Sequence, residues 1–251
     1  MRVLVVTAVA AEADSVAAGL TGLADPVPRA LPGGYALSHH PVPVPAGSAG
    51  DPSCPAPRLL AVDVLAAGVG PAAAAAGTAA ALTVGTLAGE PYGLVVSAGI
   101  GGGFQPYAPV GSLVVSDAIV AADLGAETPD GFLPVDELGF GRAVHVPSPL
   151  SARAAEALNA LHAPVLTVST VTGSAARAAA LTARHPRAAA EAMEGFGVAE
   201  AAGAHGVPVL ELRAISNPVG PRDRAAWRIG EALDALRNAC RQLLPVLEEA
   251  P

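Results

Sequence analysis

The side chains best suited to catalysis in this chain are two glutamates and an asparagine, each placed near the end of a predicted buried strand. Glu12 follows the first strand, Glu194 lies where a helix is predicted to begin, and Asn217 directly follows the last strand. A carboxylate can deprotonate water as a general base, and an amide can donate and accept hydrogen bonds at once. Each residue also has a structural explanation: an exposed helix position for Glu12, a favourable helix dipole for Glu194 and a turn for Asn217.

Short loops follow other predicted strands and add backbone groups to the same region. They are Ala67-Gly68-Val69-Gly70, Ser97-Ala98-Gly99-Ile100-Gly101-Gly102 and Ser169-Thr170-Val171-Thr172-Gly173. Ligands of α/β sheets bind at the carboxyl ends of the strands, so we expect these loops to face one site. Their glycines either let the backbone approach a ligand or only permit tight turns.

The elements that position these residues alternate along the chain between strands and helices. Strands are predicted at residues 3–7, 59–65, 94–97, 112–121, 164–171 and 208–216. Helices are predicted at residues 8–20, 71–87, 151–161 (with Ser151 as N-cap), 175–183, 194–205 and 224–249, the last interrupted before Pro245. This alternation predicts an α/β fold with a central sheet covered by helices on both faces.

The remaining long segment, residues 20–57, is predicted to be irregular because proline, glycine, serine and aspartate are frequent towards its end. We interpret residues 39–57 as a surface excursion, with His39 and His40 exposed, and not as a linker between domains. The whole chain, residues 1–251, is therefore predicted to form a single domain.

The composition excludes several classes of protein. A formal net charge of −8 disfavours a nucleic-acid binder that relies on phosphate contacts. All 14 basic residues are arginine, which excludes lysine Schiff-base chemistry and a Walker-type phosphate site. No apolar segment has the length of a membrane helix, and the histidines and cysteines lack metal-site spacing. We expect a cytoplasmic protein without metal, with Cys54 and Cys240 as free thiols or, alternatively, one long-range disulfide.

Four sequence blocks, taken in order, resemble those of one enzyme superfamily. They are AGVGPA at residues 67–72, SAGIGGG at 97–103, AMEG at 192–195 and ISNPVGPRD at 215–223. The combination is similar to the nucleoside phosphorylase and nucleosidase superfamily, in particular its methylthioadenosine/S-adenosylhomocysteine nucleosidase branch. Within that branch, the last block with Trp227 after it resembles the futalosine hydrolases. The resemblance covers nearly the whole chain and implies a single-domain, three-layer α/β fold with a mixed central sheet.

The resemblance also implies a reaction, in which water cleaves the N-glycosidic bond of a purine nucleoside without a cofactor. Glu12 matches the family's glutamate that activates water, a general-base role. Glu194, beside Met193, matches the glutamate that binds the ribose 2′- and 3′-hydroxyls. Ala98 and Gly99 match the segment whose backbone lines the base and sugar site.

Asn217 is an informative departure from the family pattern, because the adenine-cleaving nucleosidases have an aspartate there. An amide can donate to O6 or N7 of a 6-oxopurine but cannot deliver a proton, so Asn217 favours hypoxanthine over adenine by ~10- to 100-fold. The acid that protonates the leaving base stays open. Asp223 is one candidate and a turn carboxylate paired with a neighbouring arginine is its alternative; hydrogen bonding alone could also stabilise the leaving base.

Futalosine carries an aryl carboxylate at its 5′ end, so its pocket requires an apolar wall and a cation. Trp227 aligns with an aromatic residue that covers the 5′ group, and Arg222, Arg224 and Arg228 are close to it in sequence. Arginine binds carboxylates with two parallel hydrogen bonds. The alternative is an exposed helix start, where these arginines and Arg213 pair with the acidic residues Asp223 and Glu231.

Two further residue comparisons concern the base and the nucleophile. The family's purine-contacting Phe-Ile pair falls at Ala176 and Arg177 here, so Phe104 or Phe196 is expected to contact the base instead. Phosphorylases place an arginine in the loop after the first strand, whereas this chain has Glu12 there, which would repel phosphate. Hydrolysis is therefore favoured over phosphorolysis.

Together these expectations describe a futalosine hydrolase activity that releases hypoxanthine and dehypoxanthine futalosine in menaquinone synthesis. The ligands would be the purine nucleoside futalosine and water, and analogy with the superfamily suggests a homodimer or higher homo-oligomer. The alternatives are a methylthioadenosine/S-adenosylhomocysteine nucleosidase, a purine nucleoside phosphorylase, or a catalytically inactive nucleoside sensor. An inactive sensor would not require a water-activating carboxylate such as Glu12.

Overall fold

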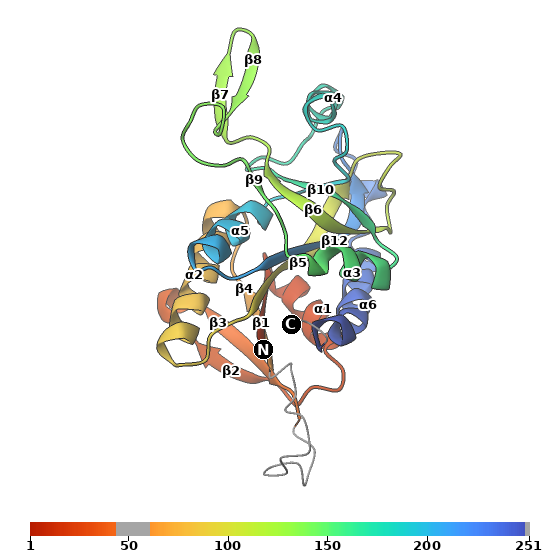
Figure 1. The fold of residues 1–251 in the computed structure, drawn as a ribbon. Coiled ribbons are helices and arrows are strands. Elements are labelled where there is room, and N and C mark those ends of the chain that lie inside the picture. Colours follow the sequence, from red (N-terminus) through yellow and green to blue (C-terminus); the bar gives the residue numbers. More distant parts are fainter. Residues whose placement is uncertain (44–60, 249–251) are drawn as a thin grey trace.

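The computed structural model describes residues 1–43 and 61–248, which form a central sheet with helices on both faces (Figure 1). The strand order is β11-β10-β6-β12-β5-β1-β4-β3-β2, with β9 paired to β6. The strands are β1 (Arg2–Thr7), β2 (Val27–Ala30), β3 (Ala36–Pro41), β4 (Ala61–Ala66), β5 (Leu94–Gly103), β6 (Leu113–Ala121), β9 (Val144–His145), β10 (Leu161–Thr167), β11 (Ala190–Ala192) and β12 (Val209–Pro218). Parallel and antiparallel pairings both occur, so the predicted mixed α/β sheet is confirmed.

The helices form two layers around the sheet. Figure 1 shows α1 (Ala10–Gly19), α3 (Leu150–Ala157) and α6 (Ile229–Glu248) on one face, and α2 (Pro71–Leu87) and α5 (Gly195–Ala204) on the other. Helix α4 (Ala175–Arg184) lies beyond the β10 end of the sheet, where the separate hairpin of β7 (Gly125–Thr128) and β8 (Gly131–Pro134) also projects. Because both faces are covered, central strands such as β1 are buried along their whole length.

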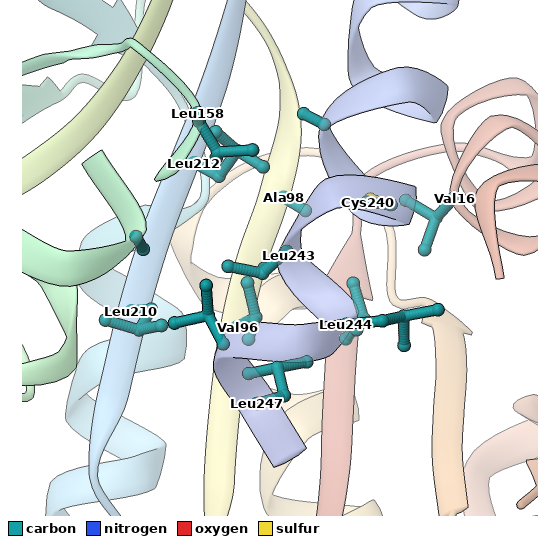
Figure 2. Packing of buried hydrophobic residues seen from close by; sticks show 14 of the residues in the cluster. Val16, Val96, Ala98, Leu158, Leu210, Leu212, Cys240, Leu243, Leu244 and Leu247 are labelled. Atoms are coloured by element: carbon teal, nitrogen blue, oxygen red, sulfur yellow. The ribbon is translucent and has the colours of Figure 1, made fainter. Parts of the chain in front are cut away.

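The largest core lies between α6 and the sheet. Leu243, Leu244 and Leu247 of α6 belong to one buried cluster with Val96 and Ala98 of β5, and Figure 2 shows Leu243 beside Val96. Burying a leucine side chain contributes about 1.5–3 kcal/mol. This packing holds the last turns of α6 in place, so the predicted interruption before Pro245 is wrong; Pro245 itself lies on the exposed side of the helix.

The carboxyl end of β5 closes part of the sheet into a ring. β5 pairs with β12 along its length and with β11 at Gly102 and Gly103, so β5, β12, β6, β10 and β11 form a closed set of pairings. The closure requires close backbone approach: a Cβ atom on Gly101 would lie 3.0 Å from the carbonyl oxygen of Glu191 in β11. The glycine run predicted to end the strand at residue 97 therefore continues it to Gly103, and that boundary prediction was wrong.

The prediction of irregular structure for residues 20–57 is wrong for most of residues 27–41. β2 and β3 form an antiparallel pair at the sheet edge, joined by the 3₁₀ turn Pro32–Gly34, and an edge strand tolerates the prolines that obscured its pattern. His39 and His40 lie in β3, with His40 buried and His39 within 2.5 Å of Asp63. The remainder of the excursion, from residue 44 onwards, and Cys54 lie outside the described residues.

The predicted N-cap of α3 is wrong, whereas the expected free thiol of Cys240 is confirmed. Ser151 lies inside α3, whose N-cap is Pro149, because its neighbour Leu150 already belongs to the helix. Cys240 is a buried free thiol, and burial raises the pKa of its side chain to about 12. Among the described residues, no helix combines the length and apolar character needed to cross a membrane.

Candidate active site

Glu12 is held by three backbone N–H groups at the carboxyl end of the sheet. Its Oε2 accepts hydrogen bonds from Ala8 at 2.9 Å and Val9 at 3.3 Å, and its Oε1 accepts one from Ile100 at 2.9 Å. The first two donors come from the turn that begins α1 and the third from β5, so the side chain connects two elements. Glu12 is only 4% exposed, which contradicts the alternative of an exposed helix residue.

Glu194 lies at the N-cap of α5 and contacts the loop before α2. Its Oε1 accepts a hydrogen bond from the backbone of Gly70 at 3.2 Å, and its Oε2 accepts one from Met193 at 3.3 Å. The carboxylate is thus used to connect two loops and does not form a side-chain cap of its own helix. This arrangement brings the AMEG and AGVGPA blocks together.

Arg213 is a buried arginine of β12 that links the site and that the sequence analysis did not place there. Its Nη1 donates to Glu194 at 3.3 Å, its Nη2 to Ser97 at 2.9 Å and its Nε to Glu211 at 3.0 Å. The interpretation that Arg213 pairs with Asp223 or Glu231 is wrong, because the side chain is 1% exposed and points into the sheet. The sequence signal for this buried ion pair was the presence of Glu211 and Arg213 at alternate positions of an otherwise apolar strand.

Gly99 keeps the space between the two parts of the site free. A Cβ atom on Gly99 would lie 2.6 Å from Oε1 of Glu12 and 2.7 Å from Nη1 of Arg213. Glu12 and Arg213 therefore approach the same point of β5 from two sides. The methyl group of the preceding Ala98 packs in the core below α6 (Figure 2), so Ala98 can contribute to the site only through its backbone.

Burial and charge together shift the pKa values of Arg213 and Glu211. Burial opposes the charged form of Arg213, but the carboxylates of Glu211, Glu194 and Glu12 outweigh this effect and raise its pKa. Burial raises the pKa of Glu211 to about 7, although the Arg213 guanidinium acts in the opposite direction. Three carboxylates thus surround one guanidinium in a nearly water-free environment.

Asn217 lies near the carboxyl end of β12, directly after Ser216, where the pairing of β12 with β5 is irregular. Its Oδ1 accepts a hydrogen bond from the Ser216 hydroxyl at 2.9 Å, and its Nδ2 donates to the carbonyl oxygen of Pro218 at 3.0 Å. The backbone N–H of Arg228 donates to Ser216 at 2.8 Å, which fixes the following turn against the strand. The side chain is partly exposed, so it has room to contact a ligand.

Comparison with known proteins identifies the family of this chain. The model of the Phosphorylase superfamily matches residues 61–250. A futalosine hydrolase of Streptomyces coelicolor is 73% identical over 187 residues, which cover 74% of this chain and 80% of that protein. A futalosine hydrolase of Acidothermus cellulolyticus is 45% identical over 242 residues, which cover 94% and 87% of the two proteins. The chain belongs to the phosphorylase superfamily and, within it, to the futalosine hydrolase family.

The fold of this family member is that of the nucleosidase branch. A crystal structure of a 5′-methylthioadenosine/S-adenosylhomocysteine nucleosidase from Colwellia psychrerythraea, in complex with adenine, superposes with a TM-score of 0.74. It is 23% identical and covers 98% of this chain and 94% of its own. The three-layer fold and the family membership predicted from the four sequence blocks are both confirmed.

The turn after β12 carries the other residues predicted to bind substrate. The guanidinium of Arg222 lies 5.4 Å, and that of Arg224 5.9 Å, from the centre of the Trp227 ring. Asp223 is exposed and caps the 3₁₀ turn Arg224–Ala226 by accepting a hydrogen bond from Ala225 at 3.1 Å. Arg228 forms an exposed pair with Glu231 at 3.7 Å. The futalosine hydrolase family member thus presents two arginines stacked beside one tryptophan next to Asn217.

The predicted base contacts divide between two regions of the protein. Phe104 is buried near the end of β5, whereas Phe196 is buried in α5 and contacts the ring of His145 edge-on at 5.1 Å. Arg177 belongs to α4 and pairs with Asp123 at 3.4 Å, and Ala176 precedes it on the same helix. Within residues 1–43 and 61–248, no group of three or more His, Cys, Asp or Glu side chains is arranged to bind a metal ion.

Proposed function

We propose that this protein hydrolyses the N-glycosidic bond of futalosine and releases hypoxanthine and dehypoxanthine futalosine, a step of menaquinone biosynthesis. The observation that carries the proposal is the convergence of Glu12, Glu194 and Arg213 around Gly99 at the carboxyl end of the sheet. The two relatives described above, both futalosine hydrolases, support the choice of substrate.

Glu12 is proposed to activate the water molecule. Three backbone N–H groups fix the carboxylate in one orientation, and a carboxylate oxygen retains lone pairs with which to accept a proton from water. General-base catalysis of this kind contributes about 10²- to 10⁴-fold. The water would attack the anomeric carbon as the bond to the purine breaks.

The charge of the site is suited to the transition state of this reaction. As the glycosidic bond breaks, the ribose acquires oxocarbenium character and therefore positive charge. Glu194, which is proposed to bind the ribose hydroxyls, lies with Glu211 and Glu12 around the single guanidinium of Arg213. This excess of carboxylates stabilises a developing cation in a water-poor environment.

The same charge favours water over phosphate as the nucleophile. Arg213 already donates from all three of its nitrogen positions to protein acceptors, so it offers little to a phosphate ion. Glu12 would repel an anion at the position of the nucleophile. We therefore propose hydrolysis and not phosphorolysis.

The two ends of the substrate would contact the carboxyl end of β12 and the turn that follows it. Asn217 is proposed to donate to O6 or N7 of the hypoxanthine base. Arg222 and Arg224, beside Trp227, are proposed to bind the aryl carboxylate, since arginine forms charge-assisted hydrogen bonds with carboxylates. Asp223 caps a turn, so we propose that hydrogen bonding stabilises the leaving base. A cytoplasmic location and a homodimer or higher homo-oligomer are also proposed.

The test is a comparison of substrates with the purified protein. Futalosine, aminofutalosine, inosine and methylthioadenosine are each incubated with and without phosphate, and the released base is separated by chromatography. The proposal predicts phosphate-independent release of hypoxanthine from futalosine. Release of adenine from methylthioadenosine at a similar rate, or a requirement for phosphate, would contradict it.

A further inference from the structure

Glu191 is a buried carboxylate to which the proposed reaction gives no role. It lies on β11, three residues before Glu194, and is 4% exposed. One of its oxygens accepts the backbone N–H of Thr172 at 2.8 Å, and the other accepts the Thr172 hydroxyl. An ionised carboxylate has about four acceptor positions, so both oxygens can accept a further hydrogen bond from a ligand.

The strand register places Glu191 and Asn217 on either side of Gly102. Gly102 of β5 is the register partner of Glu191 in β11 and also of Asn217 in β12. The two residues are thus separated by about two strand spacings, or ~9.6 Å. Because register partners present their side chains on the same face, the two polar side chains can bridge a purine ring with one hydrogen bond at each edge.

An apolar cluster adjoins both of these polar groups. It contains Phe104, Val120, Ala122, Leu166, Val168, Leu181 and Ala188, with Val219 packed against it. Leu166 is the register partner of Glu191 in β10. On the other side, Val219 Cγ2 and Asn217 Nδ2 lie 2.9 Å and 3.3 Å from the position that a Gly102 Cβ would occupy. An apolar surface with a few polar groups at its ends is typical of a site for a planar ligand.

We propose that Glu191 selects a 6-oxopurine by accepting the N1–H of hypoxanthine, while Asn217 contacts the opposite edge of the base. The inference rests on the proposed function and adds a second specificity-determining residue to it. N1 of a 6-oxopurine carries a proton, whereas N1 of adenine is an acceptor. A carboxylate opposite adenine N1 would therefore place two acceptors face to face, and Thr172 prevents the carboxylate from turning away.

The test compares kcat/KM for futalosine with kcat/KM for its 6-amino analogue, aminofutalosine. In Glu191→Gln the side chain can offer either a donor or an acceptor, so we expect the preference for futalosine to fall about tenfold or more. Thr172→Val removes the hydroxyl that orients Glu191 and should reduce the preference by a smaller factor. Glu200→Gln is the matched control, since Glu200 is half exposed on α5 and pairs with His145 at 2.7 Å; its preference should equal that of the wild type.

The ratio of the two constants separates selection from a structural role. An equal loss for both substrates in Glu191→Gln, or an unchanged ratio, would overturn the proposal. Should Glu191→Gln not yield folded protein, Thr172→Val decides by the same ratio. Calorimetric binding of free hypoxanthine and adenine provides a readout without catalysis. The role of Glu191 is supported if the wild type binds hypoxanthine more tightly than adenine and the variant loses that difference. This result would hold even if futalosine is not the substrate. Failure of the wild type to cleave either nucleoside would count against the proposed function alone.

Discussion

Arg213 donates a hydrogen bond to Glu194 at 3.3 Å, and both side chains are almost fully enclosed by the protein. Through its other nitrogens the same guanidinium contacts Ser97 and Glu211, and it lies next to Glu12 across Gly99. One residue of β12 thus holds together groups from β5, α1 and the start of α5. The position of Glu194 depends on this arginine, whereas Glu12 is held beside it by backbone N–H groups.

Replacing Arg213 by methionine should strongly destabilise the fold. Breaking a buried ion pair by removing one partner leaves an uncompensated charge and costs about 3–5 kcal/mol, and here Glu194 and Glu211 both lose their cation. Urea unfolding measures the loss. The control is Arg241→Met, an exposed arginine on α6 that contacts Asn238, where we expect a change within about 0.5 kcal/mol. Equal stability of the two variants would show that the buried pairs contribute little.

Glu12→Gln should lower kcat for futalosine by about 10²- to 10⁴-fold and change KM little, because the amide keeps the side-chain shape but cannot accept the proton from water. Steady-state kinetics measure both constants. Asp14→Asn, an exposed change on the same helix, should retain wild-type rates. A loss of less than about tenfold in Glu12→Gln would exclude the general-base role.

Glu211 should make the stability of the protein depend on pH. Burial raises its pKa to about 7 in the folded protein from the ordinary glutamate value of 4.5. The folded protein therefore holds this proton to higher pH than the unfolded chain, and its contribution to stability is present below pH 4.5 and lost as pH rises to about 7. In Glu211→Gln this contribution is absent. Thermal unfolding at several pH values should show the wild type losing stability relative to the variant across this window, and a constant difference would contradict the expectation.

Gly99→Ala should abolish most activity, because the new methyl group would displace Glu12, Arg213 or both from their positions. A misplacement of about 1 Å in an active site reduces the rate by about 10²-fold. Gly230→Ala is the matched control, since a Cβ atom there meets open space. Comparable activity of the two alanine variants would show that the site can rearrange around residue 99.

The alternation of strands and helices could be predicted from the sequence because central strands such as β1 and helices such as α2 have continuous or periodic apolar patterns. The edge strands β2 and β3 could not, since prolines and histidines mask their alternation and they depend on long-range contacts, the pairing of β3 with β4 and the burial of Leu37 in the core. Likewise, Gly101 to Gly103 suggest a loop, and the double pairing of β5 with β11 and β12 makes them strand.

The candidate site shows the same division. Glu12, Glu194 and Asn217 could be proposed because each follows a strand or begins a helix in a recognisable block. Arg213 and Glu191 could not, because their roles depend on which strands lie side by side, and neighbouring residues in a sequence do not reveal that. A charged residue within an otherwise apolar strand, as in residues 209–215, is nevertheless a usable signal of a buried ion pair.

Recognition of the aryl carboxylate can be tested separately from catalysis, because Arg222 and Arg224 lie on an exposed turn after β12, whereas Glu12 is buried. A hydrogen bond to a charged group contributes about 1.5 kcal/mol or more, so Arg224→Ala should raise KM for futalosine about tenfold. KM for inosine, which has no carboxylate at its 5′ end, should stay the same. Arg222→Ala should have the same effect if both guanidinium groups contact the carboxylate. Arg228→Ala serves as the control, because Arg228 pairs with Glu231. Parallel increases of KM for both nucleosides would indicate that the arginines stabilise the turn around Trp227 and do not bind the substrate.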